Sequence, residues 1–194
     1  MCGRMNVIDN PVMSVVFNLL GIKFVAASNN DLRPTDQVAT VANIDGKLQQ
    51  VNLNWGIKPD WSVKLLINAQ SETVADKRTF KKSFKTNRCV VPVSGWYEWR
   101  DEGGKRKQQY LFKGKQTDAL FMAGIWFSGE CTNELVTLTI TPNKTCATYH
   151  HRMPLLIDQG AIKQWLFGTV DDAQSLIVAP GEEIISVERV GLVR

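Results

Sequence analysis

The residue with the most distinctive chemistry is the cysteine at position 2, directly after the initiator methionine. A small second residue permits removal of Met1, so we expect a mature chain that begins with Cys2. Its α-amine and thiol then sit on adjacent carbons, with reference pKa values of about 8 and about 8.5. The amine can attack an aldehyde, and the thiol can then close a thiazolidine ring. Alternatively, the thiol attacks an amide carbonyl with the amine as base, or Cys2 is a small buried residue without a catalytic role.

Three further polar residues, which a family resemblance of the chain selects, are of types that suit proton transfer or orientation around such a nucleophile. Glu98 is flanked by tryptophans in the segment GWYEW at 95–99, a setting that favours a neutral carboxylic acid. His150 can exchange protons near neutral pH. Asn68 can donate and accept hydrogen bonds without adding charge. Each has a structural alternative: a solvent-facing Glu98, a structural His150, and an Asn68 that caps a following helix.

Five segments of the chain together carry a family resemblance. They are MCGR at 1–4, LINAQSET at 66–73, VSGWYEW at 93–99, FMAGIW at 121–126 and YHHRMPL at 149–155. In order and spacing, they resemble the SRAP family, the SOS response-associated peptidases together with their eukaryotic relative that shields abasic sites. The resemblance covers about residues 1 to 190, and the combination of segments is far more specific than any one of them.

The resemblance implies a function and a catalytic set. By position, the family nucleophile falls on Cys2, its asparagine on Asn68, its glutamate on Glu98 and its histidine on His150, with His151 as the rival. The implied activity is recognition of abasic sites in single-stranded DNA and formation of a thiazolidine crosslink to the sugar C1′. Such a crosslink protects the lesion during the DNA damage response, and lyase and autopeptidase activities are further expectations for this type of protein.

The resemblance also implies a DNA-binding set, which comprises Arg4, Trp55, Trp61, Arg78 and Thr141. Between 72 and 85, a predicted helix would place Arg78 with Lys81, Lys82 and Lys85 on one face, which is either a phosphate-binding stripe or the outside of an ordinary amphipathic helix. The chain departs from the family pattern at Gln70, where the family has arginine, and at His151, where it has aspartate. It reads DLRPT at 31–35 in place of NVAPT.

The predicted elements favour an α+β fold, in a single domain over residues 1–194, with a mainly antiparallel, curved or barrel-like sheet and a few flanking helices. Helices are expected at 11–20, with Asn10 as N-cap and Gly21 as the stop, and at 72–85, 161–167 and 171–178. Strands are expected at 48–57, 88–93, 108–112, 119–127, 135–141 and 183–190. The turn at 101–104 predicts a hairpin that joins 96–99 to 110–112.

Composition limits the class of protein. The 194 residues carry a formal net charge of +4 with a pI near 8.9, which fits an anionic partner without requiring one. The four cysteines form no Cys-x-x-Cys pair, so we expect no zinc site, no other metal and no cofactor. The first residues lack the basic and apolar regions of a signal peptide, and the sequence has no apolar run of about 20 residues, so we expect neither a signal peptide nor a membrane span. We expect a cytoplasmic monomer with reduced thiols and no membrane partner.

Three other functions stay open at this stage. A thiol peptidase would pair Cys2 with His150 and remove Met1 autocatalytically. An N-terminal-nucleophile amidohydrolase is a second alternative, because class II glutamine amidotransferases also begin Met-Cys-Gly. The third alternative is a DNA-binding module that makes no covalent bond, in which Cys2 is incidental.

Overall fold

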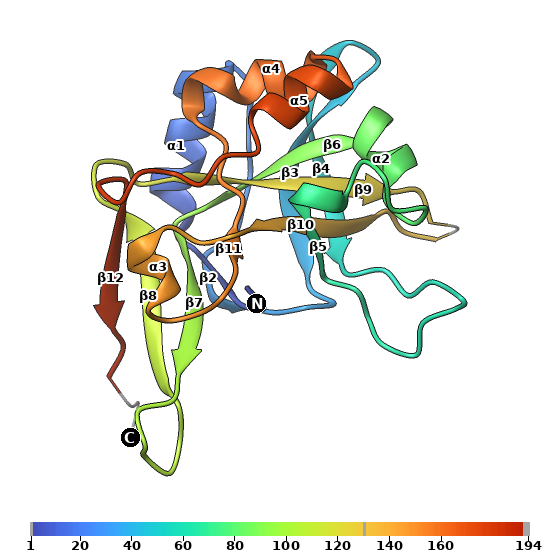
Figure 1. The fold of residues 1–194 in the computed structure, drawn as a ribbon. Coiled ribbons are helices and arrows are strands. Elements are labelled where there is room, and N and C mark those ends of the chain that lie inside the picture. Colours follow the sequence, from blue (N-terminus) through green and yellow to red (C-terminus); the bar gives the residue numbers. More distant parts are fainter. Residues whose placement is uncertain (1, 130, 192–194) are drawn as a thin grey trace.

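The computed structural model describes residues 2–129 and 131–191, and within them most strands belong to two sheets (Figure 1). The first sheet has the order β12 (Ile185–Arg189), β8 (Gln108–Gly114), β7 (Gly95–Arg100), β1 (Met5–Val7) and β2 (Asn29–Leu32). The second has the order β11 (Met153–Pro154), β10 (Glu134–Ile140), β4 (Lys47–Trp55), β3 (Gln37–Ile44), β6 (Arg88–Val93) and β9 (Leu120–Phe127), and β5 (Asn68–Gln70) pairs with β10.

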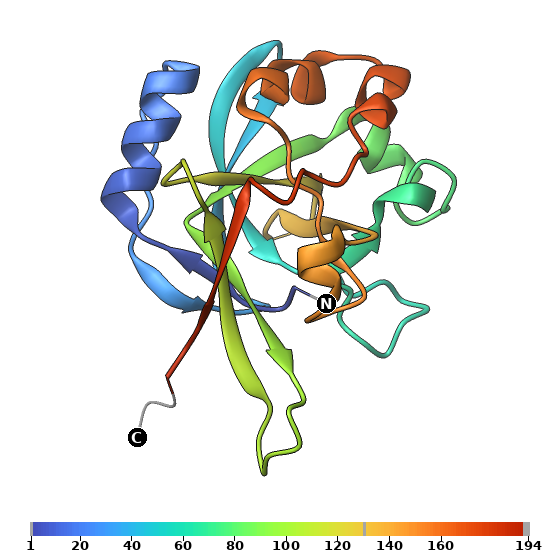
Figure 2. The same ribbon diagram turned by 60° about the vertical axis from the view of Figure 1, so that its left-hand side comes forward.

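The second sheet closes on itself, because β10 pairs with β9 as well as with β4. Most pairings are antiparallel, and the exceptions among the described strands are the short parallel pairings of β10 with β4 and β5. The predicted α+β fold with a mainly antiparallel, barrel-like sheet is therefore confirmed. The predicted hairpin is confirmed too: β7 and β8 pair from Gly95–Lys113 to Arg100–Gln108, and this hairpin projects from the lower side of the molecule (Figures 1 and 2).

Helices flank the sheets. The elements are α1 (Asp9–Leu20), η1 (Ser71–Thr73), α2 (Lys81–Thr86), α3 (Lys144–Ala147), η2 (Gln159–Ala161), α4 (Ile162–Phe167) and α5 (Val170–Ser175). In Figure 1, α1, α4 and α5 lie at the top, on the side opposite the tip of the hairpin. Helix α1 ends as predicted at Gly21, whose φ of 70° and N–H donated to the Phe17 carbonyl form a left-handed C-cap. It begins earlier than predicted, with Ile8 rather than Asn10 at the N-cap.

The predicted helix at 72–85 is wrong as a continuous element. The structure has η1, a run of turns and then α2. The cause is tertiary: the Ser71 hydroxyl donates to the Thr139 carbonyl, and Val74 is fully buried. These contacts attach the start of the segment to β10, so it cannot extend along one helix axis. Arg78 consequently lies in a turn outside the helix that carries Lys81, Lys82 and Lys85, and the predicted common face does not exist.

Candidate functional site

The pairing of β1 with β7 brings the start of the chain beside Glu98. Met5 lies opposite Trp96 in the antiparallel register, and the Tyr97 N–H donates to the Arg4 carbonyl at 3.0 Å. Cys2 precedes β1 in the chain and lies in the interior, where it is 1% exposed. Met1, whose removal the sequence-based prediction requires, lies outside the described residues.

Asn68 holds the main chain of Cys2. It begins β5, which runs parallel to β10 and pairs with it through only a few residues. The Asn68 Nδ2 donates to the Cys2 carbonyl oxygen at 2.9 Å. The helix-capping alternative finds no support, because η1 has Gln70 at its N-cap and no side-chain cap. The structure therefore brings two of the predicted catalytic residues into direct contact.

Glu98 lies on β7 and is 4% exposed. Burial raises the pKa of this carboxyl to about 7, against the lowering effect of the positive chain terminus. Burial, followed by the Glu98 charge, raises the pKa of the Cys2 thiol well above its usual range. The same two causes raise the pKa of the Cys146 thiol to about 12. At neutral pH, Glu98 can therefore exchange a proton, whereas both thiols stay protonated.

The two adjacent histidines lie in different surroundings. His150 is half-buried, and its Nδ1 lies 3.1 Å from the Arg152 carbonyl oxygen, to which a protonated Nδ1 donates, and 3.0 Å from the Arg152 backbone nitrogen. Burial is the main cause that lowers the pKa of His150, so the imidazole is mostly neutral at pH 7. His151 is exposed, with its ring centroid 4.2 Å from that of His150. His150 is thus the histidine whose ring the fold holds in place.

A clamp formed by Glu72 and Arg152 fixes the segment that carries His150. The Arg152 guanidinium donates to both Glu72 carboxylate oxygens and to the Thr139 carbonyl. The same carboxylate accepts from the Thr141 N–H at 3.0 Å and from its hydroxyl at 3.2 Å. Hydrogen bonding to Arg152 lowers the pKa of Glu72 to about 2. Thr141, predicted to contact DNA, is exposed and oriented by Glu72. The sequence analysis assigned no role to Glu72 or Arg152, although Arg152 lies within the segment at 149–155.

The guanidinium of Arg4, expected to bind a phosphate, is occupied within the protein. It forms an ion pair with Asp31 at 2.5 Å and lies over the Trp99 ring, with 5.1 Å from its carbon to the ring centroid. Asp31 also binds Arg33. Asp31 stands where the family pattern has no acidic residue. An anion that approached Arg4 would therefore compete with this carboxylate.

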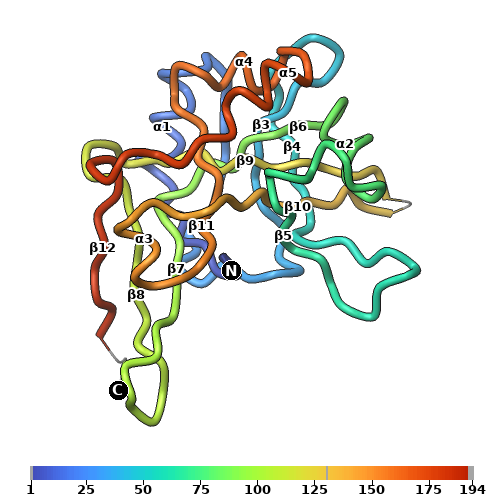
Figure 3. Tube along the Cα trace, viewed as in Figure 1, coloured from blue at the N-terminus to red at the C-terminus, as the bar shows by residue number. Residues whose placement is uncertain are grey.

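The two tryptophans predicted to contact DNA differ completely in exposure. Trp55 is fully buried and its Nε1 donates to the Ile67 carbonyl at 3.1 Å, so the prediction that it contacts DNA is corrected: its ring is a core element. Trp61 is 69% exposed on the loop between β4 and β5, which projects from the body at the right of Figure 3. Gly56 starts this loop with a φ of 118°, and a Cβ there would lie 2.7 Å from Leu65. Arg78 is exposed in the turn before α2.

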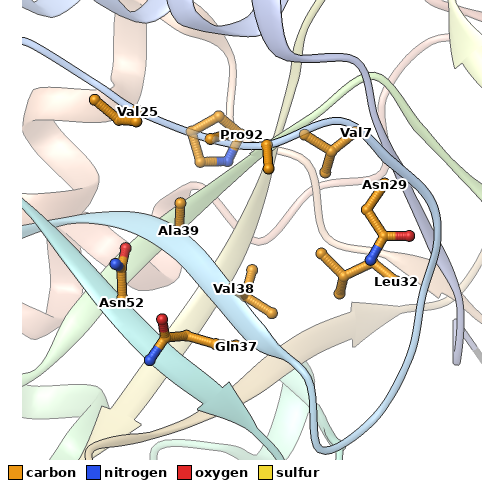
Figure 4. Close-up of a pocket in the computed structure, with 11 residues that line it drawn as sticks. Val7, Val25, Asn29, Leu32, Gln37, Val38, Ala39, Asn52 and Pro92 are labelled. Carbon is orange, nitrogen blue, oxygen red and sulfur yellow. The ribbon is translucent and has the colours of Figure 1, made fainter.

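A cavity lies away from these residues. This cavity, shown in Figure 4 and of about 220 Å³, is lined mainly by apolar or amide side chains such as Val7, Val38 and Asn52, with no titratable group among its lining residues. Within residues 2–129 and 131–191, no group of three or more His, Cys, Asp or Glu side chains is arranged to hold a metal ion. Over the same residues, no helix is both long and apolar enough to cross a bilayer.

The site thus combines a partly barrel-shaped α+β fold with a cysteine at position 2. This cysteine is buried beside Asn68 and the strand of Glu98, and these features together define the class of protein. The comparison with protein families assigns the class: the model of the SOS response associated peptidase (SRAP) family matches residues 1–191, and the chain belongs to that family.

Curated relatives carry names that refer to abasic sites. The chain is similar to "Abasic site processing protein YoqW" of Bacillus subtilis (30% identical over 147 residues, 70% of this chain), YedK of Escherichia coli (28% over 141 residues, 70%) and HMCES of Xenopus tropicalis (29% over 166 residues, 68%), both given the same description. The matched part spans 65%, 63% and 50% of these relatives, less than two thirds of each.

Solved structures share the fold. A phage-related protein of Bordetella bronchiseptica superposes with a TM-score of 0.82 at 25% identity, over 97% of this chain and 94% of that one. A second protein of the same organism gives a TM-score of 0.84 at 19% identity, over 98% of this chain and all of that one.

Proposed function

We propose that this protein captures the aldehyde of an abasic site in single-stranded DNA through the amine and thiol of Cys2. The observation that carries the proposal is the hydrogen bond from Asn68 to the Cys2 carbonyl, beside the strand that holds the buried Glu98. This bond supports the proposal because Cys2, once Met1 is removed, would lie among groups that can orient it and move protons. Family membership and the names of the relatives support the choice of substrate.

The order of bond formation follows from the protonation states. The neutral α-amine of Cys2 adds to the C1′ aldehyde, and the carbinolamine loses water to give a Schiff base. The thiol sulfur then adds to the imine carbon while its proton passes to the imine nitrogen, which closes the thiazolidine ring with one water released overall. Burial raises the pKa of the Cys2 thiol, which favours a route that begins at the amine over attack by a thiolate.

Glu98 and His150 supply the proton transfers in this proposal. Most abasic sugar is a closed hemiacetal, and its opening requires protonation of the ring oxygen. A carboxyl with a pKa of about 7 can give that proton and later protonate the departing hydroxyl. A neutral imidazole at His150, with its proton on Nδ1 donated to the Arg152 carbonyl, can accept at Nε2 the proton released from the attacking amine. Trp61 offers an exposed ring for base stacking, while Arg4, Arg78 and Thr141 would contact the DNA backbone or sugar.

The surroundings of Cys2 also bear on the three alternative functions. A peptidase or an amidohydrolase would begin with thiolate attack on a carbonyl, which the raised thiol pKa disfavours. In a DNA-binding module that forms no covalent bond, the hydrogen bond from Asn68 to the main chain of Cys2 would contribute only to packing.

The test is covalent capture. The protein, with removal of Met1 confirmed by intact mass, is incubated with single-stranded DNA that carries one abasic site and is then resolved on a denaturing gel. We expect a shifted band that survives heating without borohydride and disappears in Cys2→Ala. Cys2→Ser retains the amine, so it should give a band only after borohydride reduction. Cys131→Ala is the matched control, because Cys131 is an exposed thiol outside the site. The absence of a band from correctly processed protein would overturn the proposal.

A further inference from the structure

The side chain of Thr137 contacts Asn68 from the opposite side to Cys2. Thr137 lies on β10 directly across from Asn68 in the parallel pairing with β5, and it is 1% exposed. Its Oγ1 lies 2.6 Å from Asn68 Oδ1 and 3.2 Å from the Ile67 carbonyl oxygen. A threonine hydroxyl has a single proton to donate, so these two acceptors compete for it.

The competition favours Asn68. The Ile67 carbonyl already accepts from the Thr137 backbone N–H and from Trp55 Nε1, each at 3.1 Å. A carbonyl oxygen has two lone pairs, and these donors use both. The distance from the Thr137 hydroxyl to Asn68 Oδ1 is also the shorter one, 2.6 Å against 3.2 Å to the Ile67 carbonyl. The hydroxyl therefore donates to Asn68 Oδ1.

This hydrogen bond determines which way the Asn68 amide faces. The Cys2 carbonyl oxygen can only accept, so it requires the Nδ2 side of the amide. If the amide were rotated by half a turn, Oδ1 would face another acceptor and Nδ2 would face a hydroxyl. The Thr137 proton makes Oδ1 the acceptor on its own side, and Nδ2 is thereby directed to Cys2.

We infer that Thr137 is a positioning residue for the reaction at Cys2, an inference that rests on the proposed function. It acts through Asn68: the fixed amide holds the Cys2 carbonyl, and the held carbonyl sets the direction in which the adjacent α-amine points. Because the Thr137 side chain is buried and DNA would have little access to it, we expect it to affect the rate of capture and to leave DNA binding unchanged.

The test uses Thr137→Val, which keeps the branched shape and removes the hydroxyl. We expect the crosslinking rate at saturating DNA to fall roughly tenfold, since small misplacements of reacting groups cost factors of this order or more. The DNA concentration that gives half the maximal rate should stay within about twofold of the wild-type value. Thr137→Ser should recover at least half of the wild-type rate. In an Asn68→Ala background, Thr137→Val should have no further effect, because the two residues act in series.

Two kinetic outcomes would overturn the inference: a wild-type rate in Thr137→Val, or an equal slowing in the presence and absence of Asn68. If Thr137→Val does not fold, as judged by its unfolding transition, Thr137→Ala replaces it in every arm.

An NMR measurement separates this inference from the proposed function. The Asn68 side-chain amide and the Cys2 carbonyl carbon should give the same shifts in the wild type and Thr137→Ser, and altered shifts in Thr137→Val. If processed wild-type protein forms no crosslink yet these shifts move as expected, the proposed reaction is wrong and the positioning of Asn68 by Thr137 stands. Unchanged shifts in all three proteins would overturn the positioning role.

Discussion

Arg152 and Glu72, separated by 80 residues in the sequence, form a two-point ion pair, with Nη1–Oε1 at 2.8 Å and Nη2–Oε2 at 2.6 Å. Arg152 also reaches the Thr139 carbonyl at 2.6 Å, and its backbone nitrogen and carbonyl oxygen both lie within hydrogen-bond distance of His150 Nδ1. The pair therefore links the 3-10 turn that follows Asn68 to the histidine segment. Planar bidentate pairs of this kind add directional specificity to their charge.

This ion pair should make stability depend on acid pH. Hydrogen bonding to Arg152 lowers the pKa of Glu72 to about 2 in the folded state, against about 4.3 when unfolded. The stabilisation is present above the unfolded pKa and is lost as the pH falls through the window from about 4.3 to about 2. Because the carboxylate is largely solvated, we expect it to contribute only about 1 kcal/mol. Glu72→Gln should remove this part of the pH dependence in denaturant unfolding measured from pH 2 to 7. An unchanged slope would contradict the assignment.

Glu98→Gln should slow crosslinking by about 100-fold, the range that a positioned general acid supplies. With a pKa of about 7, the wild-type carboxyl ionises as the pH rises through neutrality, so the rate should show a falling limb there that the variant lacks. Rates measured from pH 5 to 9 provide the check. Glu188→Gln, on the outer strand β12, is the control. A wild-type rate in Glu98→Gln would exclude its role in proton transfer.

Asp31→Asn should strengthen binding of single-stranded DNA by about threefold, because it removes a carboxylate that competes for Arg4 and adds one unit of positive charge near the DNA. Fluorescence anisotropy at two salt concentrations measures the change. Asp45→Asn carries the same charge change in the distant turn between β3 and β4. Equal effects of the two substitutions would attribute the gain to net charge alone. Weaker binding in Asp31→Asn would mean that Asp31 orients Arg4 for the phosphate.

The two tryptophans should respond in opposite ways. Trp61→Ala should change the free energy of unfolding by less than about 0.5 kcal/mol and weaken DNA binding by about 1–3 kcal/mol, the value of one stacked base. Trp55→Ala should destabilise the fold by about 3–5 kcal/mol, because it empties a buried site. Denaturant unfolding and anisotropy on both variants decide the matter. Undiminished binding by a folded Trp61→Ala would remove the loop from the DNA interface.

The two histidines can be separated by matched substitutions. His150→Asn should lower the crosslinking rate at saturating DNA by at least about tenfold, as expected for loss of a proton acceptor. His151→Asn should leave the rate within about twofold, since that ring is exposed and the backbone of Arg152 does not hold it. If His151→Asn is the slower variant, the roles of the two residues are exchanged.

Much of the sheet could be predicted from local sequence. The strand at 88–93 has the predicted bounds, and β9 and β10 lie within one residue of theirs at each end. Their continuous β-branched and aromatic runs suit strands buried on both faces. The short strands β1, β2, β5 and β11 were missed, because pairings of two to four residues depend on their partners and leave little local pattern. The eight-residue strand β3 was missed as well, and its length does not explain this.

The site could be predicted only in part for the same reason. Its position indicates Cys2, and the family resemblance selects Glu98 and His150, yet the proximity of Cys2 to β7 depends on the register between Met5 and Trp96, a tertiary property. The pairs Arg4–Asp31 and Glu72–Arg152 join segments that no local period connects. The failed helix at 72–85 has the same origin, because contacts of Ser71 and Val74 with the rest of the fold override a favourable helical pattern.

The bond from Asn68 to the carbonyl of residue 2 recognises the main chain and is indifferent to the side chain it carries. The contact that holds the first mature residue is thus separate from its reactive side chain. Because the site is buried, only another small side chain would fit there. Serine at this position would be held by the same hydrogen bond, and mild periodate oxidation would convert it to a glyoxylyl aldehyde. The protein would then present an electrophile where it now presents a nucleophile, which makes its N-terminus a site for semisynthesis.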